Sequence, residues 1–135
     1  MYRTTDNMSG QNLDKIVALQ SEIAQLESLR VQKQTELSHA IALLPENSNL
    51  LFFFGDGCSF TKRAEAPVNC LEVALGKRLT RLETWHNKDN QEKYAQSGGE
   101  QNCGGVPYFY NKLSKAVLCG VSDCDAMKKW AKGAE

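Results

Sequence analysis

The chain has 135 residues, 41% of them hydrophobic and 24% charged, which is the size and composition of one soluble domain with a modest core. Sixteen basic and sixteen acidic residues cancel, so no net field favours nucleic acid or an anionic membrane as a partner. No apolar run approaches the roughly 20 residues of a membrane-spanning helix, and the first residues lack the apolar core of a secretory signal. A cytoplasmic protein is therefore expected.

The five cysteines are an odd number, and their spacings match neither a zinc site nor a small secreted disulfide framework. At least one thiol must then be free. A reducing compartment is expected, in which a cysteine that matters is usually reactive rather than structural. No metal site is predicted.

The first predicted element is a long helix over residues 12–45, after a polar lead of residues 1–11 that is predicted to be disordered. Its apolar residues recur on alternating three- and four-residue steps, the spacing of a heptad seam. They are Ile16, Leu19, Ile23, Leu26, Leu37, Ala40 and Leu44. Arg30 and Lys33 hold the two seam positions in the middle, and Pro45 ends the helix.

Two interpretations of this helix remain open. An isolated helix is marginal in water unless something covers its apolar stripe. The cover is either a second copy, giving a homodimer through residues 12–44, or the chain's own domain.

The pattern then changes to that of an α/β domain over residues 49–135. The apolar run at residues 50–54 predicts a strand buried on both faces. The later predicted elements are a helix at 59–75, a strand at 79–85, a polar helix at 88–96, a glycine-rich loop at 97–105, strands at 106–110 and 115–119, and a helix at 122–132 that begins at Ser122. The order β-α-β-α-β-β-α predicts a four-stranded mixed sheet, because a helical crossover joins parallel strands and a hairpin joins antiparallel ones.

Cys58 is placed where its thiol would be activated. It follows the first strand and leads directly into a helix, whose unpaired N–H groups and positive dipole end favour a thiolate over a thiol. Lys62 and Arg63 add positive charge on the next turn. The pKa of Cys58 is therefore predicted to lie below that of an ordinary cysteine.

These features together resemble the thioredoxin and glutaredoxin superfamily. The residues that carry the resemblance are Cys58-Ser-Phe-Thr61, Lys62, the helix proline Pro67, and Gly105-Val106-Pro107 in the place of the family's cis-proline loop. The resemblance implies a thioredoxin-like fold, with Cys58, Thr61 and Pro107 as catalytic-site residues.

The later stretch Gly120-Val-Ser-Asp123-Cys124-Asp125 is similar to the glutathione-binding segment of glutaredoxins. The resemblance therefore implies that Phe60, Lys62, Val106 and Asp123 contact a substrate or glutathione. Glutathione is the one possible cofactor, and the implied partner is a protein disulfide or a glutathione mixed disulfide.

Thr61 stands where a dithiol enzyme has its second cysteine, and a threonine cannot form a disulfide. Exchange through Cys58 must then be monothiol or use a distant resolving thiol. Cys103, four residues before Pro107, is the candidate for such a thiol, and the alternative, which is favoured, is that it is an incidental loop residue. Two functions follow: a thiol-disulfide redox protein acting through Cys58, or a non-catalytic thioredoxin-like adaptor oligomerised by its helix.

Overall fold

The computed structural model describes residues 6–135, with side chains from Gly10 onward, and its chain separates into two compact units that meet at residues 39 and 40. The first unit is the greater part of one long helix. The second is an α/β domain built on a four-stranded mixed sheet. The prediction of an α/β chain with a four-stranded mixed sheet and a long N-terminal helix is thus confirmed. No helix within residues 6–135 is both long and apolar enough to cross a membrane.

Helix α1 (Asp6–Ala42) is continuous over 37 residues. It begins at Asp6, so the prediction of a disordered lead is wrong for residues 6–11, while residues 1–5 lie outside the described part of the chain. The large seam side chains from Ile16 to Leu37 are exposed to solvent, from 39% for Leu37 to 65% for Leu26, whereas Leu44, beyond the end of the helix, is half-buried. One helix cannot bury its own apolar stripe, which explains this exposure.

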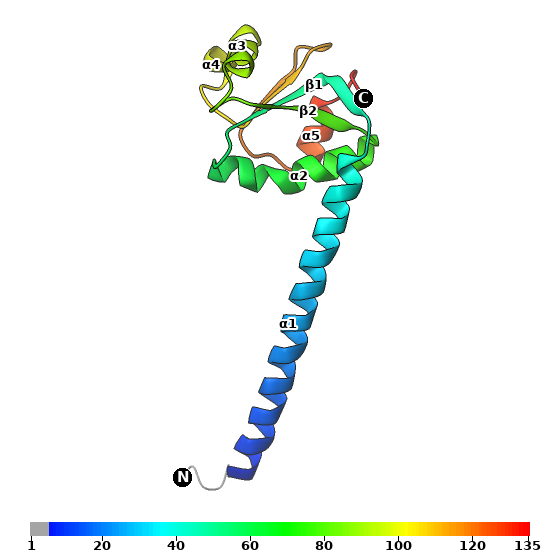
Figure 1. Ribbon diagram of the computed structural model, residues 1–135, viewed down its shortest axis with the longest axis vertical. Helices are drawn as coiled ribbons and strands as arrows, with labels where there is room; N and C mark the ends of the chain where they lie inside the picture. The colour runs from blue at the N-terminus through cyan, green and yellow to red at the C-terminus, as the bar shows by residue number, and fades with distance from the viewer. Residues whose placement is uncertain (1–5) are drawn as a thin grey trace. The chain divides into compact units, whose positions relative to one another are not determined.

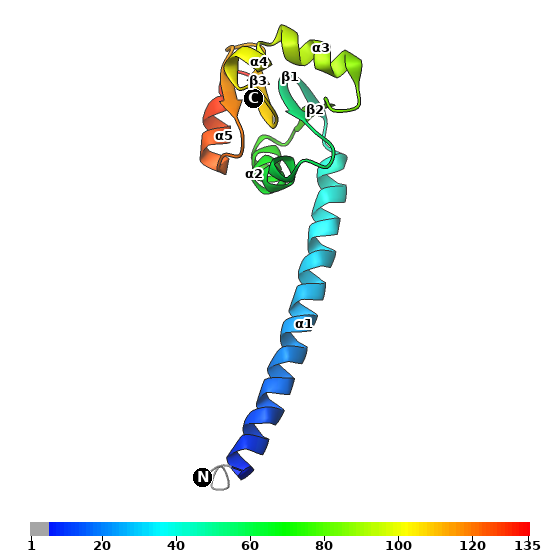
Figure 2. The same cartoon turned by 90° about the vertical axis from the view of Figure 1, so that its left-hand side faces the viewer.

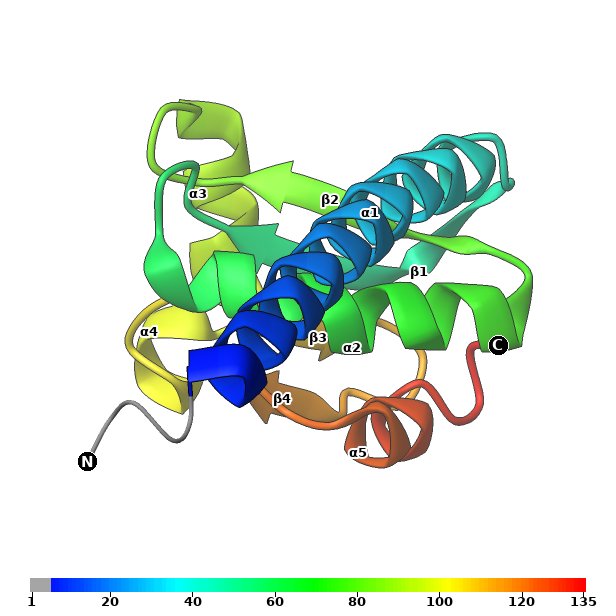
Figure 3. The same ribbon diagram turned by 90° about the horizontal axis from the view of Figure 1, so that it is seen from below.

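The sheet has the strand order β2-β1-β3-β4 (Figure 3). The strands are β1 (Glu46–Phe54), β2 (Arg78–Glu83), β3 (Tyr108–Asn111) and β4 (Val117–Cys119). β1 is parallel to β2 and antiparallel to β3, and β3 is antiparallel to β4. The apolar run of β1 therefore lies in the centre of the sheet, as a strand that is apolar on both faces must.

One face of the sheet packs against α2 (Ser59–Leu75) and α5 (Cys124–Trp130), whereas α3 (Lys88–Gln96) lies on the other side of the sheet from α2 (Figures 1 and 2). Alternate strand residues, which point to one face, join the helices in the larger core. Its main members are Leu50, Phe52, Leu79, Phe109, Val68, Leu71, Met127 and Trp130.

The opposite face is covered by α3 (Lys88–Gln96) and α4 (Gly99–Asn102) around a smaller aromatic cluster of Phe53, Leu82, Tyr94 and Tyr108. The Tyr94 hydroxyl donates to the Gly105 carbonyl at 3.1 Å and that of Tyr108 to the Ser97 carbonyl at 2.7 Å. Each buried hydroxyl therefore has a partner, as buried polar groups require.

Most of the elements differ from the sequence prediction in their bounds by a few residues. β1 begins at Glu46 rather than residue 50, because buried Asn47 is satisfied by donating to the carbonyl of Ala134. The short helix α4 lies within the predicted glycine-rich loop. The last helix is capped by Asp123 rather than Ser122, since the Asp123 carboxylate accepts from the Ala126 N–H at 2.8 Å.

Four of the five cysteines form two disulfides, Cys70–Cys124 and Cys103–Cys119. The first joins α2 to the start of α5, and the second joins the end of α4 to β4. These two disulfides differ from the expectation of a reducing compartment. Such compartments keep cysteines reduced, so structural disulfides were not expected there. The spacings along the chain gave no sign of either pairing, since the partners meet only through the fold.

Candidate active site

Cys58 is the one cysteine outside a disulfide, and it is half-buried at the N-cap of α2. The turn from β1 is closed by the Cys58 N–H, which donates to the Gly55 carbonyl at 3.0 Å, and it passes through Gly57 at φ 94°. A positive φ of this size suits glycine, which lacks a Cβ. The Lys62 N–H then donates to the Cys58 carbonyl at 3.1 Å and starts the helix.

The pKa of the Cys58 thiol is lowered from its ordinary value. Burial acts in the opposite direction and is the largest single influence. Hydrogen bonds from the Thr61 N–H and hydroxyl and the Phe60 N–H, with the positive charge of Arg63, together outweigh it. Unpaired N–H groups at a helix start stabilise an anion in this way.

Thr61 connects the thiol to the preceding turn. Its hydroxyl oxygen accepts from the Gly55 N–H at 3.4 Å, while the same hydroxyl hydrogen bonds to the Cys58 sulfur. A hydroxyl can accept and donate at once, so one side chain serves both groups. Thr61 is thus a hydrogen-bond partner of the Cys58 sulfur.

Glu83, at the end of β2, ties together two loops near the site and was not singled out from the sequence. Its carboxylate accepts from the N–H groups of Asp56, Trp85 and His86 at 2.9, 3.0 and 2.7 Å. The hydrogen bond from Asp56 is the largest cause of the lowered pKa of Glu83. The sequence signal that could have identified Glu83 is an acidic residue at the end of a strand, followed by a turn. Because β1 and β2 are parallel, Glu83 lies at the same end of the sheet as Cys58.

A shallow groove of about 310 Å³ lies beside the helix start and includes Phe60, Val106 and Pro107 in its lining. The Val106–Pro107 peptide bond is cis. Phe60 is 53% exposed and carries the Arg63 guanidinium over its ring at 4.5 Å from the centroid. The structure therefore brings Phe60, Val106 and Pro107 together at one groove by the start of α2, and Cys58 itself is not among the residues that line it.

Cys103 and Cys119 line the same groove, but they are bonded to each other with their Cα atoms 5.6 Å apart. The prediction of Cys103 as a free resolving thiol is therefore corrected. Tyr108 pairs with Cys119 between β3 and β4, so the chain just before β3 lies beside Cys119, and Cys103 bonds to Cys119 rather than to Cys58. A sulfur already in a disulfide has no thiol to offer to a mixed disulfide.

The remaining predicted residues have separate positions. Lys62 is exposed on the first turn of α2. Asp123 uses one carboxylate oxygen to cap α5 and is not among the residues that line the groove.

Within residues 6–135, no three side chains of His, Cys, Asp or Glu are grouped as metal ligands. No protein-family model, curated protein or solved structure matches the chain. The case for a function therefore rests on the residues and their geometry.

Proposed function

We propose that this chain is a thiol-disulfide redox protein with a thioredoxin-like domain, in which Cys58 is the attacking thiolate. The observation that carries the proposal is one unpaired, partly exposed cysteine with a lowered pKa at a helix start. Reactive cysteines are found in such surroundings. The order of strands and helices and the groove at Pro107 support the family resemblance.

The first chemical step is attack of the Cys58 thiolate on one sulfur of a substrate disulfide. A Cys58–substrate mixed disulfide forms, and the other substrate sulfur leaves as a thiolate. Thr61 and the first N–H groups of α2 hold the attacking sulfur as an anion. The groove formed by Phe60, Val106 and Pro107 receives the residues that flank the substrate sulfur.

Release of the mixed disulfide needs a second thiol. Thr61 has none, and Cys103 is bonded to Cys119. The resolving thiol is therefore supplied from outside the chain, by a small thiol such as glutathione or by the substrate's other cysteine. The alternative is an adaptor without turnover, which the exposed seam of α1 favours.

Site-by-site alkylation of the oxidised protein across a pH series tests the proposal. Cys58 should be modified with a midpoint below about 8.5, the value of a free cysteine. Glutathione disulfide should add one glutathione per chain at Cys58, and an added thiol should remove it. Cys58→Ser is the control, and it should take up none. A midpoint at or above the free-cysteine value, with no glutathione adduct, would contradict the redox proposal and favour the adaptor without turnover.

A further inference from the structure

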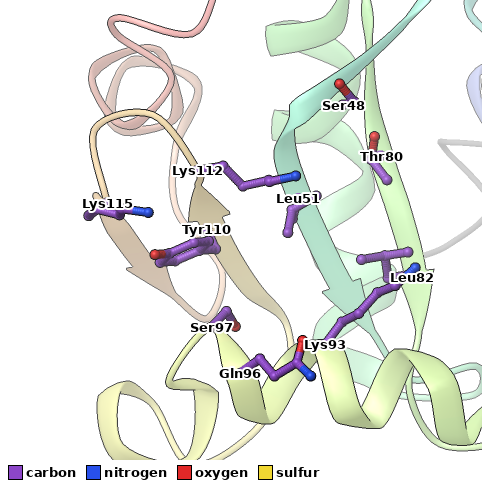
Figure 4. A pocket seen from close by; sticks show the side chains of 10 residues that line it. All are labelled: Ser48, Leu51, Thr80, Leu82, Lys93, Gln96, Ser97, Tyr110, Lys112 and Lys115. Atoms are coloured by element: carbon purple, nitrogen blue, oxygen red, sulfur yellow. The ribbon is translucent and has the colours of Figure 1, made fainter.

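A well-defined cavity of the domain lies on the α3 side of the sheet, away from Cys58. Its volume is about 520 Å³. Its lining includes Leu51 and Thr80, which pair between β1 and β2, whereas Cys58 follows the end of β1. Tyr94 of α3 packs with Phe53 and Leu82 further along the same strands, so the face at Leu51 and Thr80 remains open (Figure 4).

The side chains around this cavity combine positive charge with an apolar floor. Lys93 from α3 approaches from one side, and Lys112 and Lys115 from the β3–β4 turn approach from the other (Figure 4). Leu51 and Tyr110 lie between them. The full lining is Ser48, Leu51, Thr80, Leu82, Lys93, Gln96, Ser97, Tyr110, Lys112 and Lys115, with no acidic residue.

The charge at this site is unbalanced although the chain as a whole is neutral. Among the described residues, the ion pairs are Lys33–Glu36, Arg81–Glu72 and His86–Glu83, and none includes a lysine of the cavity. Three ammonium groups facing one hollow raise the local concentration of anions. Charge complementarity therefore selects an anionic occupant.

The turn that carries two of these lysines is built rigidly. Asn111, which is fully buried, accepts from the Leu113 and Ser114 N–H groups at 3.0 and 3.2 Å and donates to the Trp130 carbonyl at 3.0 Å. The Lys112 N–H donates to the Asn49 carbonyl at 2.8 Å. The backbone under Lys112 and Lys115 is thus fixed to the core.

Lys115 adopts a conformation that would suit glycine better. Its φ is 67°, and it is the one residue other than glycine with a positive φ in the described chain. This left-handed conformation is unfavourable for a residue with a Cβ. The Lys115 ammonium lies 6.0 Å from the centre of the Tyr110 ring, and both residues line the cavity.

We propose that this cavity binds a small organic anion that joins a planar aromatic group to a phosphate or a carboxylate. The aromatic group packs on Tyr110, Leu51 and Leu82, and the anionic group lies between the lysines. A volume of about 520 Å³ is within the usual range for small-molecule sites. The site is independent of Cys58 and of the proposed redox chemistry.

The test is a titration of the ¹⁵N-labelled full chain with 1-naphthyl phosphate and with 1-naphthoate, followed by amide shifts. Uncharged 1-naphthol and inorganic phosphate each carry half of the proposed chemistry and should bind more weakly. Shifts should gather at residues that line the cavity, such as Leu51, Leu82 and Tyr110. The ratio of the two anions' affinities tells whether phosphate or carboxylate is preferred.

Variants make the test sharp. Lys112→Gln with Lys115→Gln should weaken binding by about tenfold, since each exposed charge pair contributes a few-fold in affinity. Lys115→Gly should weaken it while raising the melting temperature, because glycine relieves the left-handed strain. Lys128→Gln on α5, away from the cavity, is the matched control and should change nothing.

Three results would overturn the proposal. The first is that neither anion binds at millimolar concentration, and the second is that binding is unchanged by the lysine variants. The third is that the amides lining the cavity shift with protein concentration rather than with the anion, which would make this surface an interface between two copies. Cys58→Ser should leave anion binding intact, so the outcome is separate from that of the redox experiment.

Discussion

At the scale of single residues, the Thr61 hydroxyl helps to lower the pKa of the Cys58 thiol. The resemblance to thioredoxins and glutaredoxins places Thr61 where the dithiol enzymes of that superfamily have a second cysteine. Thr61 hydrogen bonds to the Cys58 sulfur and also accepts from the Gly55 N–H. Thr61 thus stabilises the Cys58 thiolate without offering a second thiol. In the proposed redox reaction, this arrangement favours a long-lived mixed disulfide over rapid internal release.

Replacing Thr61 separates the hydroxyl's effect from that of the helix start. Thr61→Val keeps the shape and removes the hydroxyl, so the pKa of Cys58 should rise and alkylation at neutral pH should become severalfold slower. The N–H groups of Phe60 and Thr61 remain and should hold the pKa below that of a free thiol. Thr61→Ser keeps the hydroxyl and is the control. Identical alkylation profiles for the valine and serine variants would contradict this role.

The negatively charged carboxylate of Glu83 holds the loop of Asp56 to the loop of Trp85 and His86. Its lowered pKa means that its hydrogen bonds stabilise the fold fully above the ordinary value of 4.5 and that this contribution is lost as the pH falls through the lowered folded value. The Glu83→Gln variant should therefore be less stable than the wild type at neutral pH, and the difference should shrink in acid. Urea unfolding across pH measures it.

Glu92→Gln, on the exposed surface of α3, is the matched control for that series. It should follow the wild type at every pH. A difference between Glu83→Gln and the wild type that persists unchanged to the lowest pH would show that the carboxylate's charge is not what holds the two loops.

At the scale of elements, the two disulfides join segments that the sheet alone does not connect. Cys70–Cys124 closes a separation of 54 residues and Cys103–Cys119 one of 16. In the chain-entropy account these loops stabilise the fold by about 4 and about 3 kcal/mol. Denatured, unreduced protein should accordingly show one alkylated cysteine, and reduced protein five.

The paired variants Cys70→Ser/Cys124→Ser and Cys103→Ser/Cys119→Ser test the stabilities. Each should lower the free energy of unfolding, the first more than the second, while Cys58→Ser should change it little. Five alkylated cysteines in the denatured, unreduced protein would contradict the pairing. Calorimetry or urea unfolding gives the energies.

The sequence predicted the elements well where periodicity and flanking residues agree. Helix α3 has the predicted bounds because Asn87, whose side chain accepts from the Asn90 N–H at 3.0 Å, marks its start. The apolar run after Asn49 predicted the central strand. The first residues of β1 were missed because their polar side chains resemble a linker, and Asn47 is accommodated only by the distant C-terminus.

The site was predicted in part for a similar reason. The position of Cys58 at a helix start is a local property that the sequence contains. The disulfide between Cys103 and Cys119 depends on contacts between distant segments. The same is true of the hydrogen bond from the Asp56 N–H to the Glu83 carboxylate. Spacing along a chain does not determine which cysteines pair. The thioredoxin-like identity of the domain remains a prediction.

At the scale of the whole molecule, the exposed seam of α1 predicts self-association. Ile16, Leu19 and Ile23 are each about half exposed, at 50%, 50% and 53%. A heptad seam of this length is stabilised when two helices bury it against each other. The full chain should therefore sediment as a dimer or a larger oligomer, with Arg30 and Lys33 weakening the middle of the seam.

Substitutions in the full chain test the seam without shortening it. Ile23→Glu with Leu26→Glu should give a monomer whose Cys58 alkylation is unchanged, because charges on both helices would face each other in a dimer. Ser21→Glu, on the side of the helix away from the seam, should leave the oligomer intact. A wild-type chain that sediments as a monomer at all concentrations would contradict self-association.

The two tryptophans of the chain give the molecule a pair of optical reporters. Trp130 is 4% exposed, and its indole N–H donates to the Ala116 carbonyl at 3.1 Å, so its fluorescence follows the core. Trp85 is 51% exposed and lies so close over Gly55 that a Cβ there would collide with its ring. Gly55 also accepts from the Cys58 N–H. Emission from Trp85 therefore reads out the turn that holds the thiol, and it can change in a protein whose core emission stays constant.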